Sequence, residues 1–308
     1  MRIFVTGATG VVGRRAVPLL VAAGHRVSAV GRSAAKRAAL DRQGATPLEL
    51  DLFAPEAVRR AVVGHDVIVN LATHIPPGMR AFLPGAWRQN DRIRRIAAEI
   101  LANAALAAGA DRFVQESFAP AYPDCGDRWI DETTPLAPVR YNRTLLDAER
   151  AARIFTDSGR TGVVLRFGAF YGPDADHVRD LIRWIRRGFA PLPGPAESYF
   201  SSASHDDAAA AVVAALGVPA GTYNVVDDEP LTHRDVVDTL AGALGAPPPR
   251  LPPAWLTPVF GSLGELLSRS ERISNRKLRS AAPWRPAFPS LREGWPAVVA
   301  ALRRSGKA

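Results

Sequence analysis

A glycine-rich turn near the start of the chain is the feature that most constrains how this sequence folds. The segment 6–13 reads TGATGVVG and directly follows the apolar run 2–6, which is typical of a short buried strand. Gly7 permits a tight turn, Gly10 lets the backbone approach a ligand, and Gly13 allows a helix to pack closely on the strand. The segment therefore predicts a strand–turn–helix unit whose helix N-terminus faces an anion such as the pyrophosphate of a dinucleotide.

Apolar strand-like runs alternate with helical patterns through the first half of the chain. We predict strands at 2–6, 26–30, 46–50, 66–71, 111–117 and 161–166. We predict helices near 11–23, 34–43, 54–63, 88–109 and 141–159. This alternation is typical of the α/β class, and it predicts a doubly wound parallel sheet of the Rossmann type with helices on both faces.

The regular alternation ends after Arg166, where two proline-rich stretches, 191–195 and 247–258, favour connectors over regular elements. We therefore expect a dinucleotide-binding Rossmann domain at 1–166 and a smaller C-terminal substrate-binding region at 167–308. Residues 204–226 are expected to return to the first domain.

Composition narrows the classes of function. The formal net charge is +9, but the basic residues, nearly all arginine, are spread along the chain and often stand beside acids, which does not favour nucleic-acid binding. No apolar run is long enough to span a membrane, and the single cysteine, Cys125, excludes an internal disulfide. The chain begins without a signal-peptide pattern, so we expect a cytoplasmic protein with a small-molecule substrate, no nucleic-acid or membrane partner and no metal.

The end of the second predicted strand indicates the choice of cofactor. NAD-binding folds place an acid there for the ribose hydroxyls, whereas an arginine binds the 2′-phosphate of NADP. Here Gly31 stands where the acid would be, and Arg32 and Ser33 follow. Arg32 is suited to a bidentate grip on a phosphate, with Lys36 or Arg37 assisting, so the sequence favours NADP. NAD stays open, because Arg32 is also one surface arginine in an arginine-rich chain.

Several segments together resemble the extended short-chain dehydrogenase/reductase superfamily, and within it the NAD(P)-dependent epimerase/dehydratase family. The resemblance spans nearly the whole chain. It rests on TGATGVVG at 6–13, DL at 51–52, NLA at 70–72, LRFGAFYGP at 165–173, HDDA at 205–208 and GTYNV at 221–225.

The resemblance implies positions for the cofactor. It places Asp51 near the adenine, Ala72 near the nicotinamide ribose and Phe167 near the nicotinamide. Together with the glycine turn and the end of the second strand, the predicted cofactor-binding residues are Gly7, Thr9, Gly10, Val11, Val12, Gly13, Arg32, Ser33, Asp51, Leu52, Leu71, Ala72, Thr73, Tyr141 and Phe167.

The resemblance also implies a catalytic triad, which is degenerate here. The family uses a serine or threonine, a tyrosine, and a lysine four residues after the tyrosine. Tyr141 occupies the tyrosine position at a predicted helix start, but Leu145 stands where the lysine belongs, and Phe118 fills the serine position beside Ser117. We expect Tyr141 as proton donor, with Ser117 and His74 as further catalytic candidates.

Other polar residues follow the same strands and form a pool of replacement groups: Thr73, Asn90, Glu116, Tyr122 and Asp124. The segment 188–233 contains no arginine or lysine, and Ala169 replaces an asparagine that nucleotide-sugar enzymes of the family carry. A substrate with a diphosphate is therefore disfavoured, and a more apolar one is favoured. The predicted substrate contacts are Phe118, Tyr122, Ala169 and Phe200.

The sequence thus predicts an NADP-dependent oxidoreductase or epimerase-like enzyme acting on a small carbonyl or alcohol. Two alternatives stay open: a nucleotide-binding enzyme that performs elimination or isomerisation, and a non-enzymatic NADP-binding sensor or partner protein. A nucleotide-sugar epimerase is less favoured. The resemblance also makes a homodimer through the helices near 88–109 and 141–159 an expectation.

Overall fold

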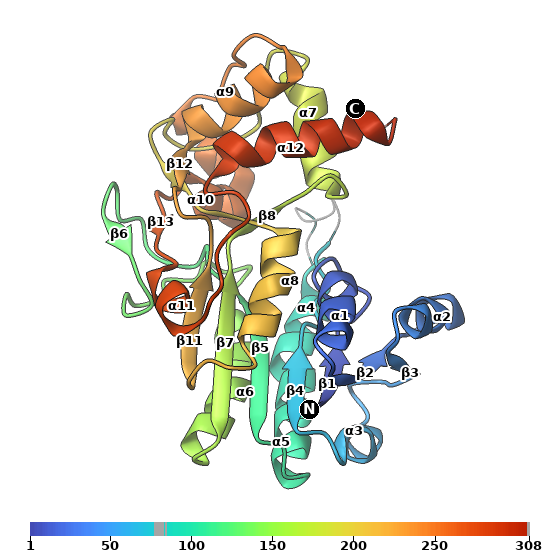
Figure 1. Ribbon diagram of the computed structural model, residues 1–308. Helices are drawn as coiled ribbons and strands as arrows, with labels where there is room; N and C mark the ends of the chain where they lie inside the picture. Colours follow the sequence, from blue (N-terminus) through green and yellow to red (C-terminus); the bar gives the residue numbers. More distant parts are fainter. Residues whose placement is uncertain (77–82, 84, 307–308) are drawn as a thin grey trace.

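A seven-stranded parallel sheet forms the centre of the computed structural model, which describes residues 1–76, 83 and 85–306 (Figure 1). The strands lie in the order β3-β2-β1-β4-β5-β7-β11 and pair in parallel throughout. Their bounds are β1 Arg2–Thr6, β2 Arg26–Val30, β3 Thr46–Leu48, β4 Val67–Asn70, β5 Arg112–Phe118, β7 Thr161–Phe167 and β11 Gly221–Val225. The order reverses between β1 and β4, and this reversal is the topological switch point of the sheet.

The strands are apolar because helices cover both faces of the sheet. Ile3, Phe4 and Val5 of β1 are all fully buried, although they point to opposite faces. The predicted Rossmann-type fold is confirmed. The third and fourth strands are shorter than predicted, and the last predicted strand extends one residue further, to Phe167.

Two layers of helices sandwich the sheet. On one face lie α1 (Gly13–Ala22) and α8 (His205–Ala214), and on the other lie α3 (Pro55–Val62), α5 (Ala98–Ala107) and α6 (Leu145–Asp157) (Figure 1). The helix α2, Ala34–Arg42, follows β2. A Cβ at Gly162 of β7 would lie 1.9 Å from the carbonyl oxygen of Ala152 in α6, so glycine is what allows this helix to pack so closely on the sheet.

Two predicted helices differ from the structure. The stretch 88–109 is divided into α4 (Arg88–Arg92), the π-helical turn η2 (Ile93–Ala97) and α5. The helix predicted from 141 begins only at Leu145, because residues 141–144 form a turn. Tyr141 therefore lies ahead of the helix and not at its start.

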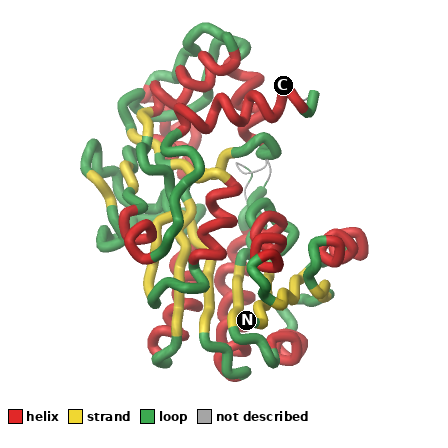
Figure 2. Tube along the Cα trace, viewed as in Figure 1, coloured by secondary structure: helices red, strands yellow, loops and turns green. Residues whose placement is uncertain are grey.

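The C-terminal region lies beyond the carboxyl ends of the strands (Figures 1 and 2). Its core packs α7 (Asp176–Ile185), α9 (His233–Leu244) and α12 (Leu291–Arg304) together. Three short strand pairs lie here: β10 (Ser202–Ser204) with β8 (Ala169–Tyr171), β12 (Leu231–Thr232) with β9 (Tyr199–Phe200), and β13 (Arg272–Ile273) with β6 (Trp129–Ile130), the last of which joins the region to the first domain.

The remaining helices complete this region: η3 (Ala254–Phe260), α10 (Gly261–Ser268) and α11 (Arg276–Ala281). The helix α12 begins with a capping box in which Ser290 and Glu293 satisfy each other's backbone N–H groups. Among the described residues, no helix combines the length and apolar character that a membrane crossing requires.

Candidate functional site

The glycine turn after β1 has the geometry that its sequence predicts. Gly7 has φ = 64°, and a Cβ there would lie 2.2 Å from the carbonyl oxygen of Leu71. A Cβ at Gly13 would lie 2.3 Å from the carbonyl oxygen of Gly7, so both positions exclude a side chain. Gly10 is exposed, and its own Cβ would meet only that same carbonyl, at 3.2 Å. The turn therefore presents bare backbone at the start of α1, which fits a pyrophosphate group.

The end of β2 is followed by an exposed cation, Arg32. Gly31 is buried, and a Cβ there would lie 3.0 Å from the Arg37 side chain, so the position has little room for an acid. The hydroxyl of Ser33 caps α2 by accepting a backbone N–H. Arg37 forms an ion pair with Glu49 at 2.7 Å, so its charge is already paired within the protein. Arg32 is exposed and pairs with none of the described residues, which leaves its guanidinium available for a phosphate.

The segments after β3 and β4, at the carboxyl edge of the sheet, carry further residues that the sequence predicts to contact the cofactor. Asn70 holds this edge together, because its side-chain oxygen accepts from the Thr6 hydroxyl at 2.5 Å and from the Ala72 backbone N–H at 3.3 Å. Asp51 is exposed, whereas Leu71 and Ala72 are buried. The other predicted residues also follow the carboxyl end of β1, β3 or β4: Thr9, Val11, Val12, Leu52 and Thr73.

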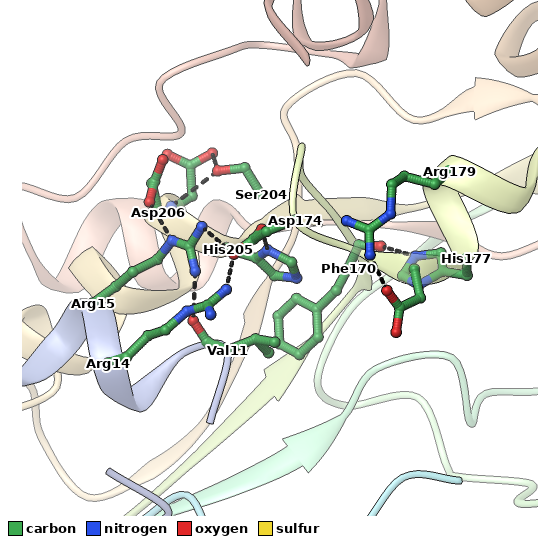
Figure 3. A network of polar contacts seen from close by, with 12 residues as sticks. Val11, Arg14, Arg15, Phe170, Asp174, His177, Arg179, Ser204, His205 and Asp206 are labelled. Carbon is green, nitrogen blue, oxygen red and sulfur yellow. Dashed lines mark hydrogen bonds and ion pairs between the residues drawn. The ribbon is translucent and has the colours of Figure 1, made fainter. Parts of the chain in front are cut away.

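Charged residues join the cofactor helix to the C-terminal region (Figure 3). Arg14 and Arg15, in the first turn of α1, both contact Asp174 in the loop after β8, and Arg15 also contacts Asp206 at 2.7 Å. His205 Nδ1 lies 3.0 Å from Asp174. Burial first, then the charge of Arg15 and other nearby cations, lowers the pKa of His205 to about 4, so this histidine is neutral at pH 7. The contacts fix α1 against α8 beside the glycine turn.

The predicted aromatic contacts separate into buried and accessible groups. Phe167 is 2% exposed and packs against Phe170, with ring centroids 5.5 Å apart. Phe118, Ala169 and Phe200 are only partly buried, so they keep surface that a ligand could contact. Their predicted role as substrate contacts stays a prediction.

A closed polar cluster contains two of the predicted site residues. Ser117 donates to Glu149 at 2.8 Å, and Arg166 binds the same carboxylate through two nitrogens, each at 2.8 Å. Arg166 also donates to the hydroxyl of Tyr122, which donates to Asn224 at 2.9 Å. All five residues are buried.

The closed cluster changes the expected roles of its members. Tyr122 is fully buried against Ile130 and Ile273, so its predicted contact with substrate is replaced by a place in the core. The Ser117 hydroxyl is hydrogen-bonded to Glu149, so we do not propose a catalytic role for Ser117. Side chains with every polar atom paired inside the protein stabilise a fold but present nothing to a ligand.

Tyr141 lies in different surroundings. Its ring packs on Trp87 at a centroid distance of 4.6 Å, in the turn just before α6. Burial raises the pKa of its hydroxyl well above the usual value; Arg94 acts to lower that pKa, and Glu271 acts to raise it further. Leu145, at the family's lysine position, is fully buried and supplies no charge.

An open polar cluster lies near Tyr141: Arg94 and Glu271 act on its hydroxyl, Asn142 follows it in the chain, and Asn90 lies three residues beyond Trp87, which packs on its ring. Four buried side-chain atoms there have no hydrogen-bond partner among the described residues: Asn90 Nδ2, Arg94 Nε, Asn142 Oδ1 and Glu271 Oε1. Asn90 accepts the His74 backbone N–H at 2.9 Å, as expected for a residue that anchors this loop. Buried polar atoms are nearly always paired, so these four atoms are hydrogen-bonding groups that a ligand or water can use.

Three of these residues were not predicted from the sequence. Arg94 lies in the π-helical turn and binds Glu116 at 3.3 Å, Asn142 follows Tyr141, and Glu271 comes from the C-terminal region. A π-helical turn inside a longer helix is frequent at functional sites, but its sequence reads as ordinary helix. His74 is exposed, so it adjoins the cluster through its backbone only, and its catalytic role stays a prediction.

Three comparisons bear on this arrangement. The family described as NAD(P)H-binding matches residues 7–219. A Streptomyces sp. protein named 3-diazoavenalumate denitrifying reductase is 36% identical over 306 residues, covering 96% of this chain and 99% of that protein. A 2-alkyl-3-oxoalkanoate reductase from Shewanella oneidensis is 28% identical over 302 residues, covering 89% and 73%. The crystal structure of human epimerase family protein SDR39U1 with NADPH has a TM-score of 0.81 at 22% identity, covering 97% and 99%.

A glycine turn at the switch point of a doubly wound sheet defines a dinucleotide-binding Rossmann protein. The chain belongs to the NAD(P)-dependent epimerase/dehydratase family of extended short-chain dehydrogenases/reductases. The predicted family and NAD(P) cofactor are thereby confirmed.

Proposed function

We propose that this protein is an NADPH-dependent reductase of a small, largely apolar carbonyl compound, with Tyr141 as the proton donor. The nicotinamide, when bound, supplies a hydride. The proposal depends on one observation: Tyr141, at the family's tyrosine position, packs on Trp87, and Arg94 and Glu271 act on its hydroxyl. Burial, which raises the pKa of Tyr141, keeps it protonated at neutral pH, and a protonated phenol can give its proton to a carbonyl oxygen.

The proposed preference for NADPH rests on Arg32, the unpaired cation at the end of β2. We expect Arg32→Ala to weaken NADPH binding about 10- to 100-fold, because a charge-assisted hydrogen bond is lost, and to leave NADH binding nearly unchanged. Arg42→Ala, an exposed arginine at the far end of α2, is the matched control. Fluorescence titration measures both affinities, and equal weakening of NADPH and NADH would remove Arg32 as the phosphate ligand.

The proposed apolar substrate rests on the residues that lie beyond the sheet. The segment 188–233 brings no arginine or lysine, while Phe118 and Phe200 keep accessible ring surface. The Shewanella relative is named as a reductase of a 2-alkyl-3-oxoalkanoate, whose oxo group is a ketone, and this supports a carbonyl substrate.

A second candidate is reductive denitrification of a diazo compound, favoured by the 36% identity to the Streptomyces protein along nearly its full length. Replacement of a diazonium group by hydride forms a C–H bond and releases N₂. No oxygen has to be protonated in that step, so it tolerates a tyrosine without its lysine.

The role of Tyr141 separates the two candidates. NADPH oxidation is measured against a panel of ketones and aldehydes and a panel of aryl diazo compounds. For carbonyl reduction, Tyr141→Phe is expected to lower the rate by about 100-fold or more, because the proton donor is lost. For denitrification, the same change is expected to leave the rate within about threefold. Tyr223→Phe, whose hydroxyl donates to Pro219 at the edge of the sheet, is the control. No turnover on either panel despite tight NADPH binding would overturn both candidates.

A further inference from the structure

A cavity of about 370 Å³ lies beside the edge strand β11, where α11 packs on the sheet (Figure 1). Residues of β6, of the loop after β11 and of the segment around α11 line it. Its volume is that of a small-molecule site. The strands β4, β5 and β7 lie between β11 and β1, which carries the glycine turn, and no predicted cofactor contact lines the cavity. The cavity is therefore separate from the dinucleotide turn.

Buried groups fix the wall of this cavity. Asn275 lines it, is 5% exposed, and donates from its side chain to the carbonyl oxygen of Val226 and to Asp228, both at 2.8 Å. The backbone N–H of Ser274 donates to the carbonyl oxygen of Ile130 at 2.8 Å, which ties the segment before α11 to β6. These contacts hold the start of α11 against the edge of the sheet, and they thereby set the positions of the arginines that the helix carries.

The lining carries more positive charge than the protein neutralises. Three arginines and one carboxylate line the cavity: Arg276, Arg279, Arg285 and Asp228. Arg279 forms an ion pair with Asp228 at 2.8 Å. Arg285 donates only to carbonyl oxygens, those of Arg279 at 3.0 Å and Trp284 at 2.6 Å, which leave its charge uncompensated. The side chain of Arg276 is exposed and forms no ion pair or hydrogen bond with any residue that the structure describes. Two guanidinium charges thus converge on one cavity without a carboxylate partner in the described part of the chain.

We propose that this cavity is a second ligand site and that its ligand is an organic phosphate monoester. A phosphate monoester carries nearly two negative charges at pH 7, which match the two uncompensated guanidinium groups, whereas a carboxylate would neutralise only one of them. The planar fork of arginine binds phosphate oxygens through two parallel hydrogen bonds. Trp129 also lines the cavity and is 50% exposed, so its ring offers apolar surface to the organic part of the ligand. The site uses no residue of the open cluster and does not depend on the proposed reduction.

Calorimetric titration of the NADPH-saturated protein with phenyl phosphate tests for the site. NADPH is added first, so that the phosphate titrant does not report on the dinucleotide turn. We expect saturable binding of phenyl phosphate and about tenfold weaker binding of phenyl sulfate, because the sulfate ester carries only one negative charge. Absence of saturable binding of phenyl phosphate, or equal affinities for the two esters, would overturn the proposal.

Arginine variants locate the bound ester. Arg276→Ala and Arg285→Ala each remove one uncompensated charge and are each expected to weaken phenyl phosphate binding about 10-fold or more. Lys277→Ala is the matched control: this lysine is exposed on the same helix but does not line the cavity, and its Nζ lies over the Tyr223 ring at 5.0 Å. We expect the control to change the affinity by about twofold or less. Equal weakening in all three variants would show an effect of net charge alone and would reject the site.

A variant that should bind more tightly completes the test. Asp228→Asn removes the charge that neutralises Arg279 and keeps a side-chain oxygen that can accept from Asn275. We expect phenyl phosphate to bind about threefold more tightly or better, because a third guanidinium becomes available to the ester. A purely structural role of these arginines gives no such gain, so unchanged or weaker binding in this variant would count against the site. NADPH affinity is measured in every variant and is expected to stay at the wild-type value. Failure of the protein to reduce any carbonyl compound would leave all of these outcomes as they are.

Discussion

Two buried polar clusters near the end of β5 differ in how completely their members are paired. In the closed cluster, Ser117, Glu149 and Arg166 use their polar groups on one another, and Tyr122 and Asn224 continue the chain of hydrogen bonds. In the open cluster around Tyr141, four residues each keep one unpartnered buried atom: Asn90, Arg94, Asn142 and Glu271. The difference teaches that burial alone does not mark a site. Several unpaired buried groups in one place are better evidence, because isolated ones also occur elsewhere, as at Gln43 and His233.

The origin of the residues explains the contrast. Ser117, Glu149, Arg166 and Asn224 lie on β5, α6, β7 and β11, whose positions the sheet fixes rigidly. The open cluster draws on the first turns of a helix interrupted by η2, the turn before α6 and a segment of the C-terminal region. Regular elements thus hold the closed cluster, whereas junctions between elements hold the open one.

We expect the largest loss in the free energy of unfolding when the ion pair of the closed cluster is removed. Arg166→Ala leaves the Glu149 carboxylate buried without its cation, and we expect a loss of about 3–5 kcal/mol in the free energy of unfolding. Arg150→Ala, on the exposed side of α6, is the control and is expected to cost about 1 kcal/mol or less. Urea denaturation measures both. Equal losses in the two variants would show that the closed cluster carries no special stability.

The same hydroxyl deletion at two tyrosines sharpens the comparison. Tyr122→Phe leaves Arg166 Nη1 and Asn224 Oδ1 without the partner they share, so we expect a loss of about 1–3 kcal/mol in the free energy of unfolding. Tyr141→Phe removes a hydroxyl with no hydrogen bond to any described residue, so its stability should change by about 0.5 kcal/mol or less. A larger loss at Tyr141 than at Tyr122 would reverse the assignment of the two clusters.

A pH dependence of stability gives the smallest expected effect. The folded pKa of Glu271 is raised above its unfolded value by burial, so the folded state binds the proton more tightly. Its contribution is fully present below the unfolded pKa and is lost as pH rises through the folded pKa. We therefore expect Glu271→Gln to match the wild type near pH 4 and to unfold at higher urea at pH 9. A Glu271→Gln variant that is less stable than the wild type at pH 9 would contradict the buried acid.

Much of the cofactor half could be predicted from local sequence. The glycine turn, the buried apolar strands and the choice between an acid and Arg32 each depend on a few adjacent residues. Local sequence does not show the direction in which a side chain points. Ser117 and Tyr122 both follow or end a strand at the correct edge, yet their side chains point into the closed cluster. The catalytic role of Tyr141 stays a prediction, and residues 141–144, predicted as helix, form a turn.

The sequence by itself determined the Rossmann fold, the dinucleotide turn and the absence of a lysine after Tyr141. These are properties of backbone conformation, burial period and residue identity, which act over a few neighbours. Only the tertiary structure decided which polar groups are paired and which are left open. That outcome depends on Arg94 and Glu271 being brought to Tyr141 from distant parts of the chain, and no local pattern records where such side chains meet.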